Sequence, residues 1–280
     1  MKKFFAILLI AGMGSFVMNS CQKSADVKLS DDQQVSTQYS LGCKLLSAEE
    51  YAKVPLAKEE TTTAPFKAAL TLFCPPVGNQ GGEGSCVAWG TTYAARSILW
   101  EKDHHATSYS YSVNIFSPEY VYNQIKVGSC ASGSYVTDAL ALLYNQGACR
   151  WSLMPYTDVS CSTLPNTTQK NDARIYWTNS YGAVTRSTSA IKAKLNAGIP
   201  VIVAGPVNNA FMYLANGAVL STFSGSSLGG HCYCVVGYDD AKNAFKFMNS
   251  WGTGWASAGF GWINYNNITT WWTEAYVMGN

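Results

Sequence analysis

The chain has 280 residues, of which 48% are hydrophobic and only 13% are charged, and its formal net charge is +2. This low charge, without any basic block, gives no sign of nucleic-acid binding. The nine cysteines indicate some disulfides if the chain is exported. Beyond the first 70 residues about 210 remain, enough for one substantial core or for two lobes.

The N-terminus has the pattern of an export signal. Two lysines follow Met1, and residues 4–17 form an apolar run of 14 residues. This run is too short to span a bilayer and fits a secretory signal over residues 1–20. A small residue followed by Cys21 resembles a bacterial lipoprotein signal, in which the cysteine is lipidated. We therefore expect a lipid-anchored protein of the bacterial cell envelope, at the outer membrane; the alternative is an ordinary cleaved signal with an incidental cysteine.

Residues 21–70 are mostly polar and are interpreted as the lipidated cysteine followed by a flexible tether. Residues 39–51 are less polar. They contain Ser47 and Glu50 at the spacing of a capping box, which predicts a short helix. The alternatives to a tether are a segment that packs on the domain or a short propeptide.

Cys86 follows a glycine-dense stretch, Gly78–Gly84, and precedes apolar residues at helical spacing up to Trp100. Ser85 is a suitable N-cap residue, which places Cys86 in the first turn of the predicted helix. The positive end of a helix favours a thiolate and lowers the pKa of a cysteine there.

The rest of the chain predicts one more helix and then strands, which is an α+β order. The predicted helix covers residues 132–147 and closes at Gly147, and the predicted strands cover residues 198–204, a stretch that begins at His231, residues 244–249 and residues 259–265.

His231 follows Cys86 by 145 residues, and Asn249 follows His231 by 18 residues. A thiol, an imidazole base and an amide that orients the imidazole are the minimum set for thiol-based acyl transfer. Each residue alone has an ordinary interpretation: an inert buried thiol, a core histidine or a turn asparagine. Their order and spacing together favour catalysis by Cys86, His231 and Asn249.

These residues, with Gln80 six positions before Cys86 and the run Asn249-Ser-Trp251-Gly, resemble the papain family of cysteine peptidases. The resemblance covers residues 71–280 and implies a two-lobe α+β fold, with a helical lobe bearing Cys86 and a β-barrel lobe bearing His231 and Asn249. It further implies the following roles: Gln80 as oxyanion donor, Trp251 as cover of the His–Asn hydrogen bond, Ser132 and Gly133 as residues beside the substrate backbone, and Ala204 as lining of the pocket for the side chain before the scissile residue.

The resemblance has departures. Glu83 stands where the family has a cysteine, which we expect to place a negative charge beside the mouth of the site. Cys130 and Cys161 lie where the family has disulfide cysteines without their usual partners, and the resemblance implies that they pair with each other.

The sequence thus predicts a secreted, lipid-anchored, monomeric cysteine peptidase, an endopeptidase rather than an exopeptidase, acting on peptides or proteins without a cofactor. No Cys-x-x-Cys pair is present, so no metal site is expected. The alternatives are a non-catalytic binding module with the same fold, and an enzyme that transfers the acyl group to an amine.

Overall fold

The computed structural model describes residues 38–60, 65–158 and 160–280. All of these lie in the unit formed by Ser36–Asn280. The expected signal, residues 1–20, and the expected lipidation site, Cys21, lie outside the described residues. Within the described ranges, no helix combines the length and the apolar character needed to cross a membrane.

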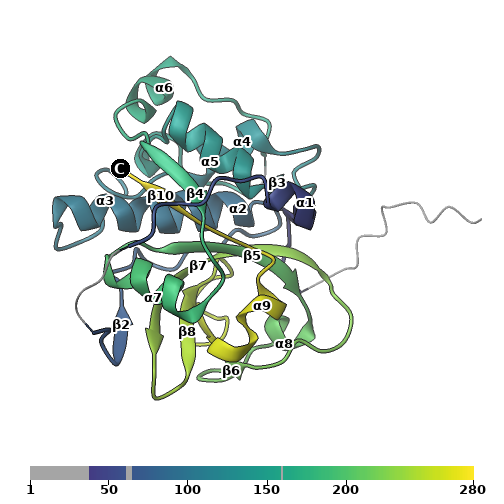
Figure 1. Ribbon diagram of the computed structural model, residues 1–280. Helices are drawn as coiled ribbons and strands as arrows, with labels where there is room; N and C mark the ends of the chain where they lie inside the picture. Colours follow the sequence, from purple (N-terminus) through teal and green to yellow (C-terminus); the bar gives the residue numbers. More distant parts are fainter. Residues whose placement is uncertain (1–37, 61–64, 159) are drawn as a thin grey trace, which may run out of the picture. The chain divides into compact units, whose positions relative to one another are not determined.

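The helical lobe is built around the helix that begins at Cys86 (Figure 1). Three consecutive segments form it: α2 (Cys86–Ala88), a π-helical segment (Trp89–Arg96) and α3 (Ser97–His104). π-helical insertions often occur at functional sites. The sequence prediction of a helix with Cys86 in its first turn is confirmed.

The other helices are short. They are α1 (Ala48–Tyr51), α4 (Pro118–Ile125), α5 (Val136–Asn145), α6 (Thr167–Ala173), α7 (Thr188–Asn196), α8 (Asn209–Met212) and α9 (Ile268–Trp271). The predicted capping box at Ser47 is present. The helix predicted from residue 132 instead begins at Val136, because Gly133 has a positive φ of 80° and the next two residues form a strand. Gly147, with a φ of 79°, follows this helix as expected.

The β lobe is an eight-stranded sheet with the order β4-β10-β5-β7-β8-β9-β6, in which β2 also pairs with β7. The strands are β2 (Ala69–Thr71), β4 (Ser180–Ala183), β5 (Val201–Val207), β6 (Val219–Leu220), β7 (Gly229–Asp239), β8 (Ala244–Met248), β9 (Phe260–Asn264) and β10 (Glu274–Gly279). The four predicted strands correspond to β5, β7, β8 and β9. A separate parallel pair joins β1 (Cys43–Lys44) to β3 (Ser134–Tyr135).

The central strands are buried on both faces. On β7, Cys232 and Cys234 belong to a core shared with the helices, whereas Tyr233 and Val235 belong to a second core within the sheet. This alternation follows from the two-residue period of a strand. By the same alternation His231, near the start of β7, projects on the side of Tyr233, where its ring lies against Phe211 and Trp251 of the second core.

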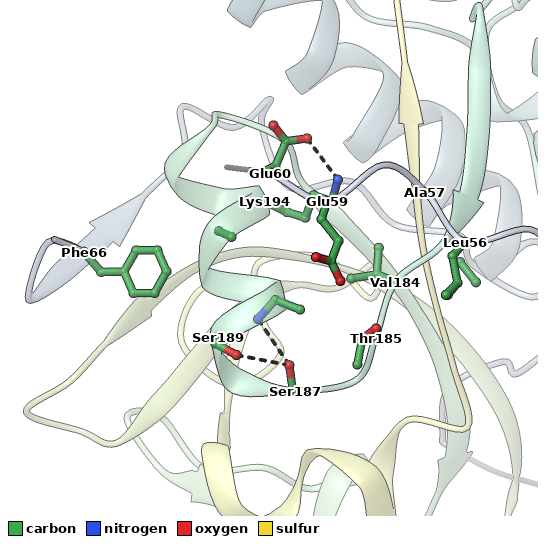
Figure 2. Close-up of a pocket in the computed structure, with 13 residues that line it drawn as sticks. Leu56, Ala57, Glu59, Glu60, Phe66, Val184, Thr185, Ser187, Ser189 and Lys194 are labelled. Carbon is green, nitrogen blue, oxygen red and sulfur yellow. Dashed lines mark hydrogen bonds and ion pairs between the residues drawn. The ribbon is translucent and has the colours of Figure 1, made fainter. Parts of the chain in front are cut away.

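Residues 38–60 are packed on the domain and are not a free tether. Leu56 forms a bridge with Ala183, and the Lys194 ammonium pairs with the Glu60 carboxylate at 2.9 Å. These contacts line a pocket of about 310 Å³ between this segment and α7, which contains no residue of the predicted site (Figure 2). The tether interpretation is therefore wrong for this part of residues 21–70.

The expected disulfide between Cys130 and Cys161 is present and closes a loop with a sequence separation of 31. Its loss should lower the free energy of unfolding by about 3–4 kcal/mol, because the unfolded chain gains the entropy of the open loop. Urea unfolding of Cys161→Ser against the unchanged protein measures this difference. The two proteins should become equally stable in strong reductant; a difference that persists there would assign the effect to packing instead.

Candidate active site

Cys86 is fully buried and begins α2, directly after the loop formed by residues 78–85. The Gly84 amide donates to the Cys130 carbonyl at 2.8 Å, which ties this loop to the disulfide. Ser85 occupies the N-cap position, but its hydroxyl contacts the Tyr156 hydroxyl at 2.7 Å and makes no capping bond. The predicted first-turn position of Cys86 and the N-cap position of Ser85 are thus confirmed, but Ser85 makes no capping hydrogen bond.

The geometry of the His231–Asn249 pair fixes the tautomer of the imidazole. His231 Nε2 lies 2.8 Å from Asn249 Oδ1, and the same oxygen accepts the Ser250 amide at 2.8 Å. Since an amide oxygen only accepts, Nε2 carries the proton and Nδ1 keeps a free lone pair. Nδ1 has no hydrogen-bond partner among the described residues. Asn249 therefore leaves the imidazole as a base at Nδ1.

Trp251 covers this pair, as the sequence predicted. Its ring stacks on His231 with 4.5 Å between the ring centroids, and Tyr39 stacks on Trp251 at 4.7 Å. His231 itself is fully buried. The hydrogen bond to Asn249 is thus shielded from water, which strengthens it.

Gln80 is held by both ends of its side-chain amide. Its Oε1 accepts the Ser250 hydroxyl at 2.7 Å, and its Nε2 donates to the Glu83 carbonyl at 2.9 Å and to the Ser40 carbonyl at 3.1 Å. The Trp251 indole also donates to the Ser40 carbonyl, at 3.2 Å. The expected oxyanion donor therefore holds a peptide carbonyl.

That carbonyl belongs to residues 39–46, which we call the strap. The Gly42 amide donates to the Gly230 carbonyl at 3.3 Å, and the Gly42 carbonyl accepts the Ser134 amide at 2.9 Å. Farther along, the Leu46 amide donates to Glu274 Oε1 at 2.6 Å. The strap therefore runs over the predicted site, from its contact with Trp251 to its contact with Glu274. The sequence analysis did not locate it there.

Burial under the strap affects both reacting groups. It raises the pKa of the Cys86 thiol to about 12, although amide groups including those of Cys232 and Gly42 oppose the change. It lowers the pKa of His231 to about 4, against the opposing effect of the Asn249 hydrogen bond. The sequence analysis expected a lowered thiol pKa, and the structure has a raised one. Burial excludes water, which disfavours both the thiolate of Cys86 and the imidazolium of His231. Cys86 and His231 are neutral here.

The predicted substrate-binding residues divide into two groups. Gly133 lies against the strap, since a Cβ there would be 1.9 Å from the Gly42 carbonyl oxygen. Ala204 pairs with Cys232 on one side and with Glu274 on the other. In contrast, the Ser132 hydroxyl turns into its own loop and contacts Ser129 at 3.0 Å.

Glu274 was missed by the sequence analysis. It is fully buried, and Tyr276 donates to its second carboxylate oxygen at 2.7 Å. No motif surrounds it, and only the register of β10 against β5 brings it beside Ala204. Glu274 therefore places a buried carboxylate beside Ala204, the residue that the resemblance assigns to a substrate pocket.

Glu83 belongs to the loop formed by residues 78–85, but its side chain is buried, with 2% of the residue's surface exposed, and does not stand at the mouth of the site as expected. The Tyr156 hydroxyl lies 3.3 Å from its carboxylate and also donates to the Gln80 carbonyl at 2.6 Å. Burial raises the pKa of Glu83 to about 7, with help from Glu119 and Asp158, whereas Tyr156 and Lys126 lower it.

Glu83→Gln should therefore stabilise the protein above neutral pH. Because the folded pKa of Glu83 is raised, wild-type stability should fall between about pH 4.5 and pH 7 and stay level above that range. The Glu83→Gln variant does not lose stability in this way. Its free energy of unfolding should exceed that of the wild-type protein by about 1–3 kcal/mol at pH 8 and differ little at pH 4.5. Urea unfolding at both pH values tests this, with the exposed Glu49→Gln as control. An equal effect at both pH values would rule out titration of Glu83 as the cause.

Comparison with known proteins agrees with this geometry. The sequence model described as "Papain family cysteine protease" matches residues 67–278. Gamete and mating-type specific protein A of Dictyostelium discoideum is 29% identical over 200 residues, which cover 70% of this chain and 42% of that protein. Cathepsin B-like CP1 of Giardia intestinalis is 26% identical over 194 residues, which cover 66% of this chain and 62% of that protein. The chain thus spans about two- to three-fifths of the length of these curated relatives.

Solved structures share the fold. Xylellain, a cysteine protease from Xylella fastidiosa, superposes with a TM-score of 0.71 at 23% identity, over 87% of this chain and 96% of that one. Digestive procathepsin L2 from Tenebrio molitor superposes with a TM-score of 0.70 at 19% identity, over 86% of this chain and 78% of that one. With the family match over most of its length, the chain belongs to the papain family of cysteine proteases.

Proposed function

We propose that this protein is a lipid-anchored endopeptidase of the bacterial cell envelope, and that the strap keeps it latent. The observation that carries the proposal is the pair of hydrogen bonds from Gln80 and Trp251 to the Ser40 carbonyl, beside a fully buried Cys86. The Gln80 amide, which would hold the substrate oxyanion, instead holds the chain's own backbone. A substrate would reach the thiol only after the strap is displaced or cut.

The reaction follows from the positions of the donors and the base. The Cys86 thiol passes its proton to His231 Nδ1, and the sulfur attacks the substrate carbonyl. The oxyanion accepts hydrogen bonds from Gln80 Nε2 and the Cys86 amide. The imidazolium protonates the leaving amine, which leaves a thioester. His231 then takes a proton from water, and the hydroxide releases the carboxylic acid and restores the thiol.

The anchor follows from the sequence pattern at Cys21. A lipidated cysteine would hold the domain at the membrane without a transmembrane helix. Cys21→Ser should release the protein from the membrane fraction into the soluble fraction. An unchanged distribution of the protein would argue against this anchor.

Glu274 supports a preference for basic side chains in the pocket beside Ala204. When the strap leaves, Glu274 Oε1 loses the Leu46 amide and requires another donor. An arginine or lysine one residue before the scissile residue would supply a charged one. Glu274→Gln should lower the ratio of kcat/KM for arginine over that for phenylalanine at this position by about tenfold. An unchanged ratio would place the basic preference, if any, elsewhere.

The function is tested by mass-spectrometric mapping of cleavage in a peptide library, with iodoacetamide modification of Cys86 as the matched measurement. Internal cleavage that disappears when Cys86 is alkylated supports an endopeptidase. Removal of terminal residues only would make it an exopeptidase, and amide products formed with an added amine would favour the transferase alternative. Absence of turnover from a protein whose strap has been displaced would favour the binding module.

A further inference from the structure

Two buried thiols belong to the segments that come together where the strap crosses β7, and neither is assigned a part in the proposed reaction. Cys43 lies in the strap with 6% of its surface exposed, and Cys232 follows His231 with none exposed. Both are free and belong to the same core cluster. Catalysis needs only Cys86, so these two thiols are left without a role.

The backbone places Cys43 over the face of β7 that carries Cys232. A Cβ on Gly230 would lie 2.2 Å from the Cys43 carbonyl oxygen, and the Gly42 amide donates to the Gly230 carbonyl. Residues two apart on a strand project from the same face, so the Cys232 side chain lies on the side of the sheet that Gly230 turns toward the strap.

The electrostatic environment agrees with this placement. Burial raises the pKa of Cys43 well above its usual range, and negative charge at Cys232, then at Cys86, would raise it further. Cys232 has the stronger effect of the two, and its use would leave the nucleophile free.

We propose that Cys43 and Cys232 form a reversible disulfide that locks the strap over the active site, an inference that rests on the latency proposed above. The oxidant would be a low-molecular-weight disulfide. When the strap lifts, the Cys43 thiolate attacks one sulfur of the oxidant and releases one thiol. When it closes, the Cys232 thiolate attacks the mixed disulfide at the Cys43 sulfur and releases the second thiol. Two protein thiols are oxidised, and one disulfide is reduced to two thiols.

We call this disulfide between Cys43 and Cys232 the latch. It would convert the reversible closing of the strap into a covalent closure. In the reduced protein the strap is held by hydrogen bonds and packing and can open. With the disulfide formed, closing becomes intramolecular at a high effective concentration. Thiol reductants would then release the strap as well as keep Cys86 reduced.

The test uses the Cys86→Ser protein, in which neither self-cleavage nor oxidation of the nucleophile occurs. It is treated with oxidised glutathione, mapped by non-reducing peptide mass spectrometry, and followed by hydrogen exchange at the Gly42 and Leu46 amides. We expect a peptide linked through Cys43 and Cys232, and exchange at both amides at least about tenfold slower than in the reduced protein. Adding Cys43→Ser or Cys232→Ser should abolish both effects. Cys234→Ser, on the same strand, should abolish neither.

The outcomes distinguish failure of the disulfide proposal from failure of the latency proposal. Absence of the Cys43–Cys232 peptide, or a linked peptide without slower exchange, overturns the latch. If the reduced protein already lacks protection at Gly42 and Leu46, the latency proposal fails as well. Protection in the reduced protein without any linkage leaves latency intact and refutes only the latch.

Discussion

Cys86→Ser is expected to lower kcat/KM for peptide hydrolysis by at least about 10⁴-fold. The imidazole of His231 has a free lone pair at Nδ1, and Asn249 fixes its tautomer. A hydroxyl is far harder to deprotonate than a thiol, so the serine would leave base and oxyanion donors without a nucleophile. The measurement is kcat/KM on a fluorogenic peptide, using protein whose strap has been displaced.

The control for this variant is Cys149→Ser, which changes another fully buried thiol in the helical lobe. It should leave kcat/KM within a few-fold of the unchanged protein, even if it lowers stability. His231→Ala should match the loss at Cys86, because nucleophile and base act as a unit. If Cys86→Ser retained substantial hydrolysis while folded, another residue would be the nucleophile and the proposed site would be wrong.

The candidate catalytic residues could be recognised because the chemistry proposed for them constrains the sequence around them. A nucleophile at a helix start needs a loop, a small residue and an apolar helical pattern, and Cys86 has all three in the printed sequence. Gln80, His231 and Asn249 were found by their spacing from it. The central strands were also predictable, because β5 and β7 are buried on both faces and read as continuous apolar runs.

The strap and Glu274 could not be predicted because they depend on pairing between distant segments. The parallel register of β1 with β3 joins residues about 90 positions apart, and no local pattern encodes it. Glu274 approaches Ala204 only through the register of β10 against β5. Its position near the strap then depends on where Leu46 lies. The capping hydrogen bond expected from Ser85 is absent for a similar reason, since the distant Tyr156 contacts its hydroxyl instead.

Gly42→Ala should activate the protein without touching any catalytic group. A Cβ at this position would lie 2.1 Å from the Gly84 carbonyl oxygen, so the two backbones cannot both stay in place. Gly84 is held by its bond to the Cys130 carbonyl, next to the disulfide, so the strap should move. Overpacking of this kind costs about 1–3 kcal/mol, which corresponds to an increase of about 5- to 150-fold in the open form.

Two measurements should follow the opening together. The first is kcat/KM in reductant, which should rise with the open population if the closed strap dominates in the unchanged protein. The second is the rate of Cys86 alkylation at neutral pH, which should rise because an uncovered thiol regains water and its pKa falls from about 12. Lys44→Ala is the matched control, since this exposed strap residue presents its side chain to solvent. Unchanged rates in a folded Gly42→Ala protein would show that the strap does not limit access to Cys86, because the clash acts on the strap and leaves Gln80, His231 and Asn249 in place.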